Sequence, residues 1–146
     1  MNDKPEFASV LDLPDEEIKE PQPFPGGSYV CLVKGLPEYD KSSQKQTPFA
    51  RFNLQPLQAM DDVDQQSLAD MGGFGNRNIR ATYYLTEDAA YRAKEFCDHC
   101  QVPSGGTLRH RLEQCQGQQV VVVLRHGMSD RTGKPFHEIA RTAQVA

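Results

Sequence analysis

Hydrophobic and polar side chains alternate along two segments in the middle of the chain, residues 49–57 and 78–85. A period of two is that of a β-strand with one buried face, so each segment is predicted to be a strand. An earlier segment, residues 28–36, combines apolar and β-branched residues directly after a Gly-Gly turn and is predicted to be another. The first 85 residues are therefore expected to supply three consecutive strands.

The hydrophobic period then changes to that of a helix. Thr86 supplies an N-cap hydroxyl, and the two acids after it suit the positive end of a helix dipole. A shorter helix is predicted over residues 108–115, with Gly117 as its left-handed cap. The apolar face of the first helix is formed by Ala89, Ala93, Phe96, Cys97 and Cys100.

Two more strands are predicted near the C-terminus, a valine-rich one over residues 118–125 and another over residues 135–142. The link between them, residues 127–134, contains Ser-Asp-Arg-Thr-Gly and is predicted to be a hairpin loop. Three strands, a helix and two strands is the order of the OB-fold. We therefore expect a mainly β protein, a five-stranded OB-fold barrel with a helix between strands three and four; an open antiparallel α+β layer is the alternative.

The composition is that of one folded domain, because 38% of the 146 residues are hydrophobic and 25% are charged. The longest apolar run, residues 120–124, is far shorter than the roughly 20 residues of a membrane span, and the start of the chain is not a secretory signal. We expect a cytoplasmic protein that does not contact the membrane. We divide it into an acidic, proline-rich arm (residues 1–27) and a domain (residues 28–146) with an acidic, glycine-rich insert (residues 58–78).

Charge is unevenly distributed along the chain. The first 20 residues contain seven acids and two lysines, whereas the remaining residues contain 14 basic and 13 acidic side chains. The net charge of −4 therefore arises in the arm, and the domain itself is nearly neutral. This balance excludes a protein that is basic throughout, but it is compatible with a local basic groove.

The cysteines are too few and too scattered for a disulfide framework. Cys97, His99 and Cys100 resemble part of a zinc site, but on a helix His99 points about 100° away from Cys100. With Cys115, the cysteines are better interpreted as small buried apolar residues, and a thiol or metal enzyme built on them is a weaker hypothesis. No phosphate-binding, hydrolase or metalloprotease motif is present, so we expect neither an enzyme nor a cofactor.

Basic and aromatic side chains occur where OB barrels hold single strands, on strands two and three and in the loops joining strands one to two and four to five. The first loop, residues 34–46, supplies Lys34, Tyr39, Lys41 and Lys45. The second supplies Arg125, Arg131 and Lys134. The outward faces of strands two and three supply Phe49, Arg51, Arg80 and Tyr84.

These residue types suit an unpaired nucleic-acid strand, because cations bind phosphates while rings stack on bases that a duplex does not expose. Tyr39 and Tyr84 are predicted to stack, with Phe49 as a further candidate, and the lysines and arginines to contact phosphates. The loops are only modestly basic, +1 over residues 34–47 and +2 over residues 125–134. Three neutralised phosphates would give a slope of log K against log salt of about −2, and these contacts do not separate DNA from RNA.

Several short segments resemble those of small phage- or prophage-encoded OB-fold proteins that bind single-stranded DNA. The resemblance covers about residues 20–143 and is one of pattern. The matching segments are Pro-Phe-Pro-Gly-Gly-Ser-Tyr (23–29), Gln-Thr-Pro-Phe-Ala-Arg-Phe (46–52), Tyr-Leu-Thr-Glu-Asp-Ala (84–89), Gly-Gln-Gln-Val-Val-Val-Val (117–123) and Gly-Lys-Pro-Phe-His-Glu-Ile (133–139).

The resemblance implies a protein that coats or protects single-stranded DNA in replication, recombination or repair inside a bacterial host cell. It also implies replication or recombination proteins as partners. In one respect the chain departs from that group, since many such proteins end in an acidic tail that recruits partners. Here no acid follows Glu138, and the acidic segment is at the N-terminus.

Another class of function stays open, an OB-like module that binds or inhibits a protein through the insert (residues 61–70) and the arm. Asp61, Asp62 and Asp64 would suit Ca²⁺ or Mg²⁺, although acids on a polar loop usually only interact with water. Homo-oligomerisation is also open, because strand one or the valine-rich strand four would pair between subunits if its edge were exposed.

Overall fold

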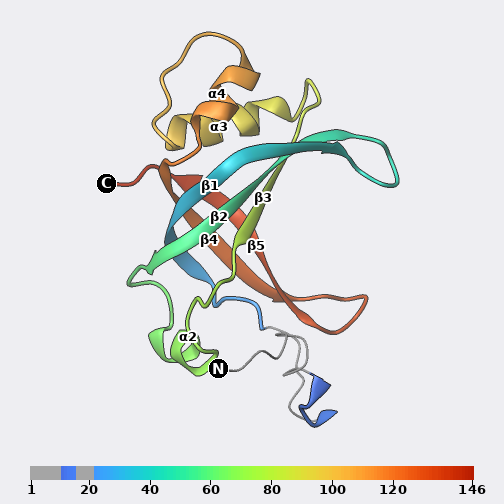
Figure 1. Ribbon diagram of the computed structural model, residues 1–146, viewed down its shortest axis with the longest axis vertical. Helices are drawn as coiled ribbons and strands as arrows, with labels where there is room; N and C mark the ends of the chain where they lie inside the picture. The colour runs from blue at the N-terminus through green and yellow to red at the C-terminus, as the bar shows by residue number, and fades with distance from the viewer. Residues whose placement is uncertain (1–10, 16–21) are drawn as a thin grey trace, which may run out of the picture.

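Five strands form one antiparallel sheet in the computed structural model, which describes residues 11–15 and 22–146 (Figure 1). Their order across the sheet is β3-β2-β1-β4-β5, and every neighbouring pair is antiparallel. The mainly β class and the order of the elements along the chain are thereby confirmed. The strands are β1 (Gly27–Lys41), β2 (Pro48–Ala59), β3 (Ile79–Tyr84), β4 (Gln119–Met128) and β5 (Pro135–Ala143).

The two outer strands of the sheet are β3 and β5. Within the part of the chain that the structure describes, hydrogen bonding does not join these two edges, so the sheet is not closed into a barrel. Strands β1 and β4 lie inside the sheet, with a partner on each side. Where they pair with each other, over residues 27–32 of β1 and 119–124 of β4, neither strand offers an edge for pairing between subunits.

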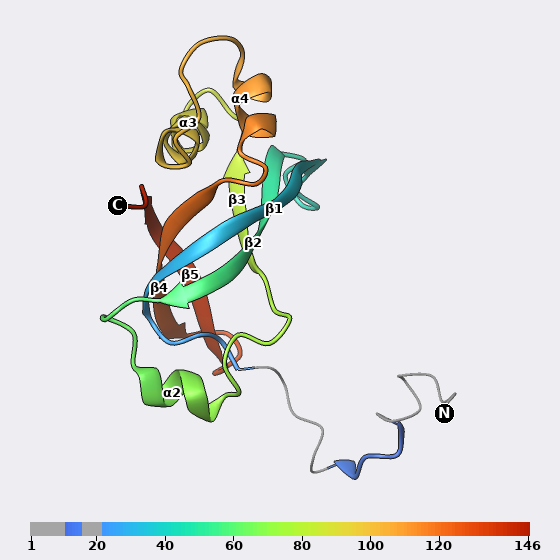
Figure 2. The ribbon, with the colours of Figure 1, turned by 60° about the vertical axis from the view of Figure 1, so that its left-hand side comes forward.

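Helices cover both ends of the sheet (Figures 1 and 2). Helices α3 (Ala90–His99) and α4 (Leu108–Gln114) lie together at one end, and α2 (Gln65–Asp70) lies at the other. Helix α3 begins later than predicted, because Thr86 caps a preceding turn by accepting from the Ala89 N–H at 3.2 Å. None of the helices described over residues 11–15 and 22–146 has the length and apolar character needed to cross a bilayer.

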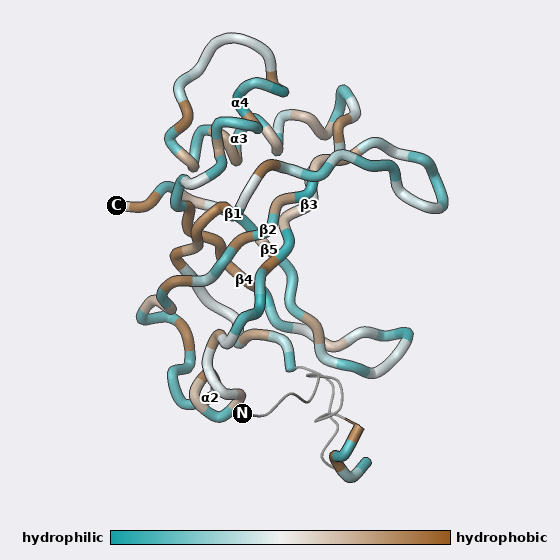
Figure 3. Tube along the Cα trace, in the orientation of Figure 1, coloured by the Kyte–Doolittle hydropathy of each residue, from teal (hydrophilic) through white to brown (hydrophobic). Residues whose placement is uncertain are grey.

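Both long hairpins extend further than the hydrophobic pattern predicts. Strand β1 continues to Lys41 and β4 to Met128, so the connecting loops are only residues 42–47 and 129–134. The prediction of a loop over residues 34–46 is therefore wrong for its first eight residues. Figure 3 shows that the hairpin tips are hydrophilic. None of the strand residues after Pro37 of β1 or after Leu124 of β4 is buried, so no buried face is present there to produce a period.

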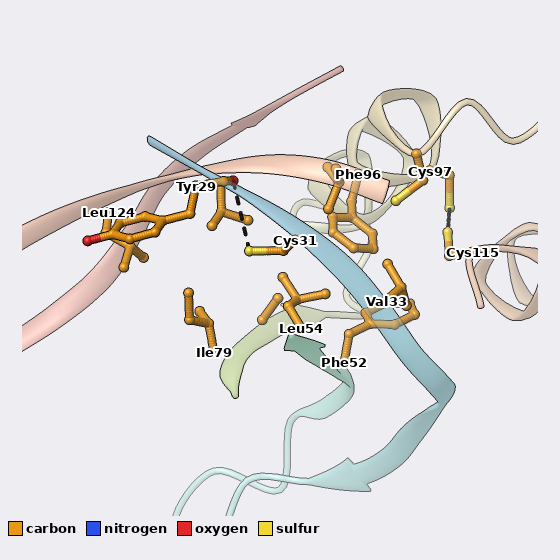
Figure 4. Packing of buried hydrophobic residues seen from close by; sticks show 14 of the residues in the cluster. Tyr29, Cys31, Val33, Phe52, Leu54, Ile79, Phe96, Cys97, Cys115 and Leu124 are labelled. Carbon is orange, nitrogen blue, oxygen red and sulfur yellow. Dashed lines mark hydrogen bonds between the residues drawn. The ribbon is translucent and has the colours of Figure 1, made fainter. Parts of the chain in front are cut away.

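The core lies on the inner face of the curved sheet, beneath α3. Phe52 packs on Phe96 of α3 with ring centroids 4.8 Å apart, and Phe96 also contacts Tyr83 at 5.0 Å. Figure 4 shows that Leu54 and Ile79 continue this layer. These residues are the apolar faces that the alternation predicts for β2 and β3, which confirms both faces.

A second group of rings closes the other end of the core. Phe24 is fully buried, with its ring centroid 5.9 Å from that of Tyr29 and 6.0 Å from that of Phe74. Arg77 covers the Phe24 ring at 4.4 Å. The end of the segment that we assigned to the arm is thus part of the core, whereas residues 1–10 and 16–21 lie outside the described residues.

The chain enters β1 through a glycine that this packing requires. Gly27 has φ +133°, and a Cβ there would lie 2.7 Å from Val63 Cγ2. Next to it, Asp62 accepts hydrogen bonds from the Ser28 N–H and hydroxyl at 2.8 and 2.7 Å. These hydrogen bonds connect the acidic insert to the start of β1.

Replacing Phe24 by Ala is expected to lower the free energy of unfolding by about 3–5 kcal/mol, because a buried ring is lost and a cavity remains. Urea unfolding followed by circular dichroism measures this. Leu11→Ala is the control, since Leu11 is 75% exposed and its loss should change stability by less than about 0.5 kcal/mol. Equal stability of the two variants would contradict the burial of Phe24.

His137 of β5 holds the Phe24 backbone. Its Nδ1 accepts the Phe24 N–H at 2.9 Å, and its ring stacks on the Phe24 ring with centroids 5.6 Å apart. An acceptor nitrogen must be unprotonated, so this contact requires the neutral imidazole. Burial, with nearby Arg77 and His126, lowers the pKa of His137.

Stability should therefore decrease on acidification. A histidine whose pKa is lowered by folding stabilises the protein fully above its ordinary value of about 6.5, and this contribution is lost as the pH falls below that value. We expect the free energy of unfolding to fall between about pH 7.5 and pH 5 in the wild type. His137→Gln keeps an acceptor but does not titrate, so its profile should be flatter; parallel profiles would refute the role of His137.

Candidate nucleic-acid interface

Three cross-strand pairs occupy the outward face of β2 and β3. Residues opposite one another in an antiparallel pair point to the same side, so the register fixes which side chains meet. Three residues of β2 face three of β3, and polar and aromatic groups make up the whole set. The pairs are Phe49 with Tyr84, Arg51 with Thr82, and Asn53 with Arg80.

Arg51 lies at the centre of this outward face. Its guanidinium carbon is 4.6 Å from the centroid of the Phe49 ring, and its Nε donates to Thr82 Oγ1 at 3.3 Å. The Phe49 and Tyr84 rings meet edge to face, 6.3 Å apart. Phe49 is only 6% exposed, whereas Tyr84 is 47% exposed. Tyr84 is therefore the accessible ring, and Phe49 supports it and Arg51 from below.

The tip of the β1–β2 hairpin adds Lys45 to this surface. A hollow of about 540 Å³ lies between the loop and the start of the helical segment. Lys45 and Tyr84 both line it, together with Thr47 and Thr86. Two predicted site residues from distant parts of the chain thus share one depression.

Tyr39 and Lys41 do not join this group. Tyr39 is opposite Ala50, whose side chain is buried on the inner face, and alternation places Lys41 on the same side as Tyr39. The Tyr39 ring lies 5.7 Å from the Arg109 guanidinium of α4. Burial and the neighbouring Glu113 raise the pKa of Tyr39. The structure therefore separates Tyr39 from Tyr84.

Strand β1 borders the outward face with mixed charge. Lys34 is opposite Asn53 and thus lies on the outward side. A register shift follows, after which Glu38 is opposite Arg51 and Asp40 is opposite Phe49. The β1 border near Arg51 is consequently acidic, which was not expected from the lysines of this segment.

The β4–β5 hairpin carries the remaining predicted residues. Arg125 is on β4 rather than in a loop, and it forms an ion pair with Glu138 of β5. Arg131 and Lys134 are in the connecting loop (residues 129–134). Figure 1 shows that this hairpin and the β1–β2 hairpin extend toward the same side of the molecule. The two loops therefore flank one surface, but Arg125 is already neutralised by its partner.

A groove of about 600 Å³ runs between the two edge strands, β3 and β5. Arg80 and Tyr84 line it from β3, and Arg141 from β5. Tyr91 and Arg92 line it from α3. Sequence reasoning missed Tyr91, Arg92 and Arg141. For Tyr91 and Arg92, the available signal was an exposed Tyr-Arg pair on the polar side of the predicted helix.

All four cysteines are buried. Cys31 lies on β1, Cys97 on α3, and Cys100 and Cys115 directly follow α3 and α4; Figure 4 labels Cys31, Cys97 and Cys115. The Cys115 thiol donates to Cys97 Sγ at 3.8 Å. As helical spacing predicts, His99 points elsewhere and its Nδ1 lies 2.7 Å from Thr142 Oγ1. Among residues 11–15 and 22–146, no group of three or more histidines, cysteines and acids converges to hold a metal ion.

Two acids of the insert, Asp62 and Asp64, form hydrogen bonds within the fold. Asp62 caps the start of β1, and Asp64 accepts the Gln66 and Ser67 N–H groups at 3.0 and 3.1 Å as the N-cap of α2. These hydrogen bonds lower the pKa of both carboxyls. Helix α2 was not predicted, because six residues are too few to show a period.

Comparison with known proteins identifies no relative, since no protein-family model and no curated protein matches the chain.

The four cysteines should be unreactive in the native protein. Burial raises the pKa of Cys31 to about 12, and contact with Cys100 together with burial raises that of Cys115 to about 12. A shift from 9.0 to about 12 lowers the thiolate fraction at neutral pH about a thousandfold. A disulfide reagent should titrate all four thiols only in denaturant. Rapid reaction of a native thiol would instead support a thiol-based activity.

Proposed function

We propose that this protein binds single-stranded DNA and coats or protects it during replication, recombination or repair. The observation that carries the proposal is the outward β2–β3 face, where Arg51 and Arg80 accompany the exposed ring of Tyr84. Guanidinium groups bind phosphates, and an exposed ring stacks on a base regardless of its identity. The combination suits an unpaired strand, whose bases have free faces.

The arrangement of the strands supports an OB-fold for this domain. OB barrels are five-stranded and partly open, and they bind oligonucleotides on strands two and three and on the loops between strands one and two and four and five. Here the edge strands β3 and β5 face one another across the groove, as they would in a barrel opened along that line. The loops at residues 42–47 and 129–134 flank the same side (Figure 1).

Charge sets the expected strength of binding. The site offers a few separated cations, and Glu38 and Asp40 lie on its β1 border, so affinity should be moderate and strongly dependent on salt. We place the protein in the cytoplasm of a bacterial host, as a non-enzymatic partner of replication or recombination proteins. The acidic N-terminal segment is our candidate for contacts with those proteins.

Arg51→Ala combined with Arg80→Ala tests the assignment of this face. We expect the double variant to bind an unstructured oligonucleotide at least about tenfold more weakly at low salt, because two charge-assisted contacts are lost. The slope of log K against log salt should become less steep by about 1.4, at about 0.7 for each phosphate released. Fluorescence anisotropy with a labelled oligothymidylate measures both quantities.

A matched control removes the same charge from another surface. Lys94→Ala combined with Arg109→Ala changes two exposed cations on α3 and α4 and should leave affinity within about twofold of wild type. Single-stranded RNA and duplex DNA are measured in the same salt series. Equal binding by the two double variants, or tighter binding to duplex than to single strands, would reject the proposal.

A further inference from the structure

The groove between the edge strands is continuous with the β2–β3 face. Arg80 and Tyr84 belong to both, since they point outward from β3 and also line the groove. From there the groove extends along β5 to the first turn of α3, where Tyr91 and Arg92 line it. A polymer lying on the β2–β3 face therefore enters the groove simply by crossing the edge of β3.

The lining of the groove suits a polyanion. Three arginines line it, Arg80, Arg92 and Arg141, against two glutamates. One of these, Glu138, is already ion-paired with Arg125 on β4. The arginines come from three different elements, β3, α3 and β5, so cations occur at several places along the groove.

On the opposite border, the part of β1 beyond Lys34 has the reverse charge. Glu38 and Asp40 of β1 are opposite Arg51 and Phe49 of β2 and lie on the outward side with them. Phosphates approaching from this side meet carboxylates and are repelled, whereas those on the β3 side meet arginines. A strand held at Arg51 is therefore directed across β3 rather than across β1.

The first turn of α3 provides a ring and a cation together. Tyr91 is 58% exposed, and its hydroxyl accepts from Arg92 Nε at 3.2 Å. The Arg92 guanidinium carbon is 5.8 Å from the Tyr91 ring centroid. Such a pair offers a stacking surface for a base beside a charge for the next phosphate.

We infer that the bound strand continues beyond the β2–β3 face, across the edge of β3 and through the groove to α3. Tyr91 stacks on a base there, and Arg92 and Arg141 contact phosphates. This inference rests on the proposed function and extends it, because it assigns a second segment of the DNA path to residues of α3 and β5. A long strand should contact both segments, and a short one only the first.

The test compares two oligothymidylates, of about 4 and about 16 nucleotides, the range of site sizes for one OB domain. Tyr91→Leu should weaken binding of the longer strand by about fivefold or more, whereas Tyr91→Phe, which keeps the ring, should not. Arg92→Ala should make the salt slope for the longer strand less steep by about 0.7, whereas Lys94→Ala on the same helix should not. Neither Tyr91→Leu nor Arg92→Ala should change binding of the shorter strand.

The outcomes separate the two proposals. If wild-type protein binds both strands and the groove variants behave like their controls, the path through the groove is wrong while the proposed function stands. If Tyr91→Leu and Arg92→Ala weaken binding of the short and the long strand equally, the path is also wrong, because the short strand would then already bind in the groove. If wild-type protein binds neither strand, both proposals fail. Thermal unfolding of each variant confirms that these exposed substitutions leave the fold intact.

Discussion

The register between β2 and β3 is the constraint on which both the core and the candidate interface depend. Because side chains alternate along a strand, placing Phe52 opposite Ala81 on the inner face places Arg51 opposite Thr82 on the outer face. A shift of one residue would expose Phe52 and remove its contact with Phe96, so core packing fixes the register from inside. The outward arrangement of arginines and rings is thus a consequence of how the core packs.

The fold could be predicted from the sequence wherever a buried face leaves a period. Alternation located β2 and β3, and the helical period located the two helices after β3. Strands β1, β4 and β5 were located instead by their apolar or β-branched content and the turns beside them. The ends of the hairpins could not be located, because strands that pair beyond the core have no buried face. Phe24 was misassigned for a related reason, since a proline-rich segment shows no period even where one ring is anchored.

The candidate site was predictable in part, for the same physical reason. Alternation identified Arg51, Arg80 and Tyr84 correctly as outward residues, because their faces follow from local spacing alone. Tyr39 was assigned to the same surface because residues 34–46 were predicted to be a loop. In the structure it belongs to β1, where alternation from the inward Val33 places it on the inner side, opposite Ala50. The groove depends on the curvature of the whole sheet, which brings β3 and β5 together although residues 85–134 lie between them in the sequence.

His137 connects the groove to the N-terminal segment. Its ring accepts the Phe24 N–H, and the same residue lines the groove between β3 and β5. The segment that precedes Phe24 along the chain carries the acidic excess. His137 therefore contacts the residue that follows this segment and also lines the proposed DNA path. Because Phe24 fills the end of the core that Tyr29 and Phe74 also line, a displacement of His137 would be opposed by packing of the whole ring group. His137 is therefore held in the groove wall by the same contacts that fix where the chain enters the domain.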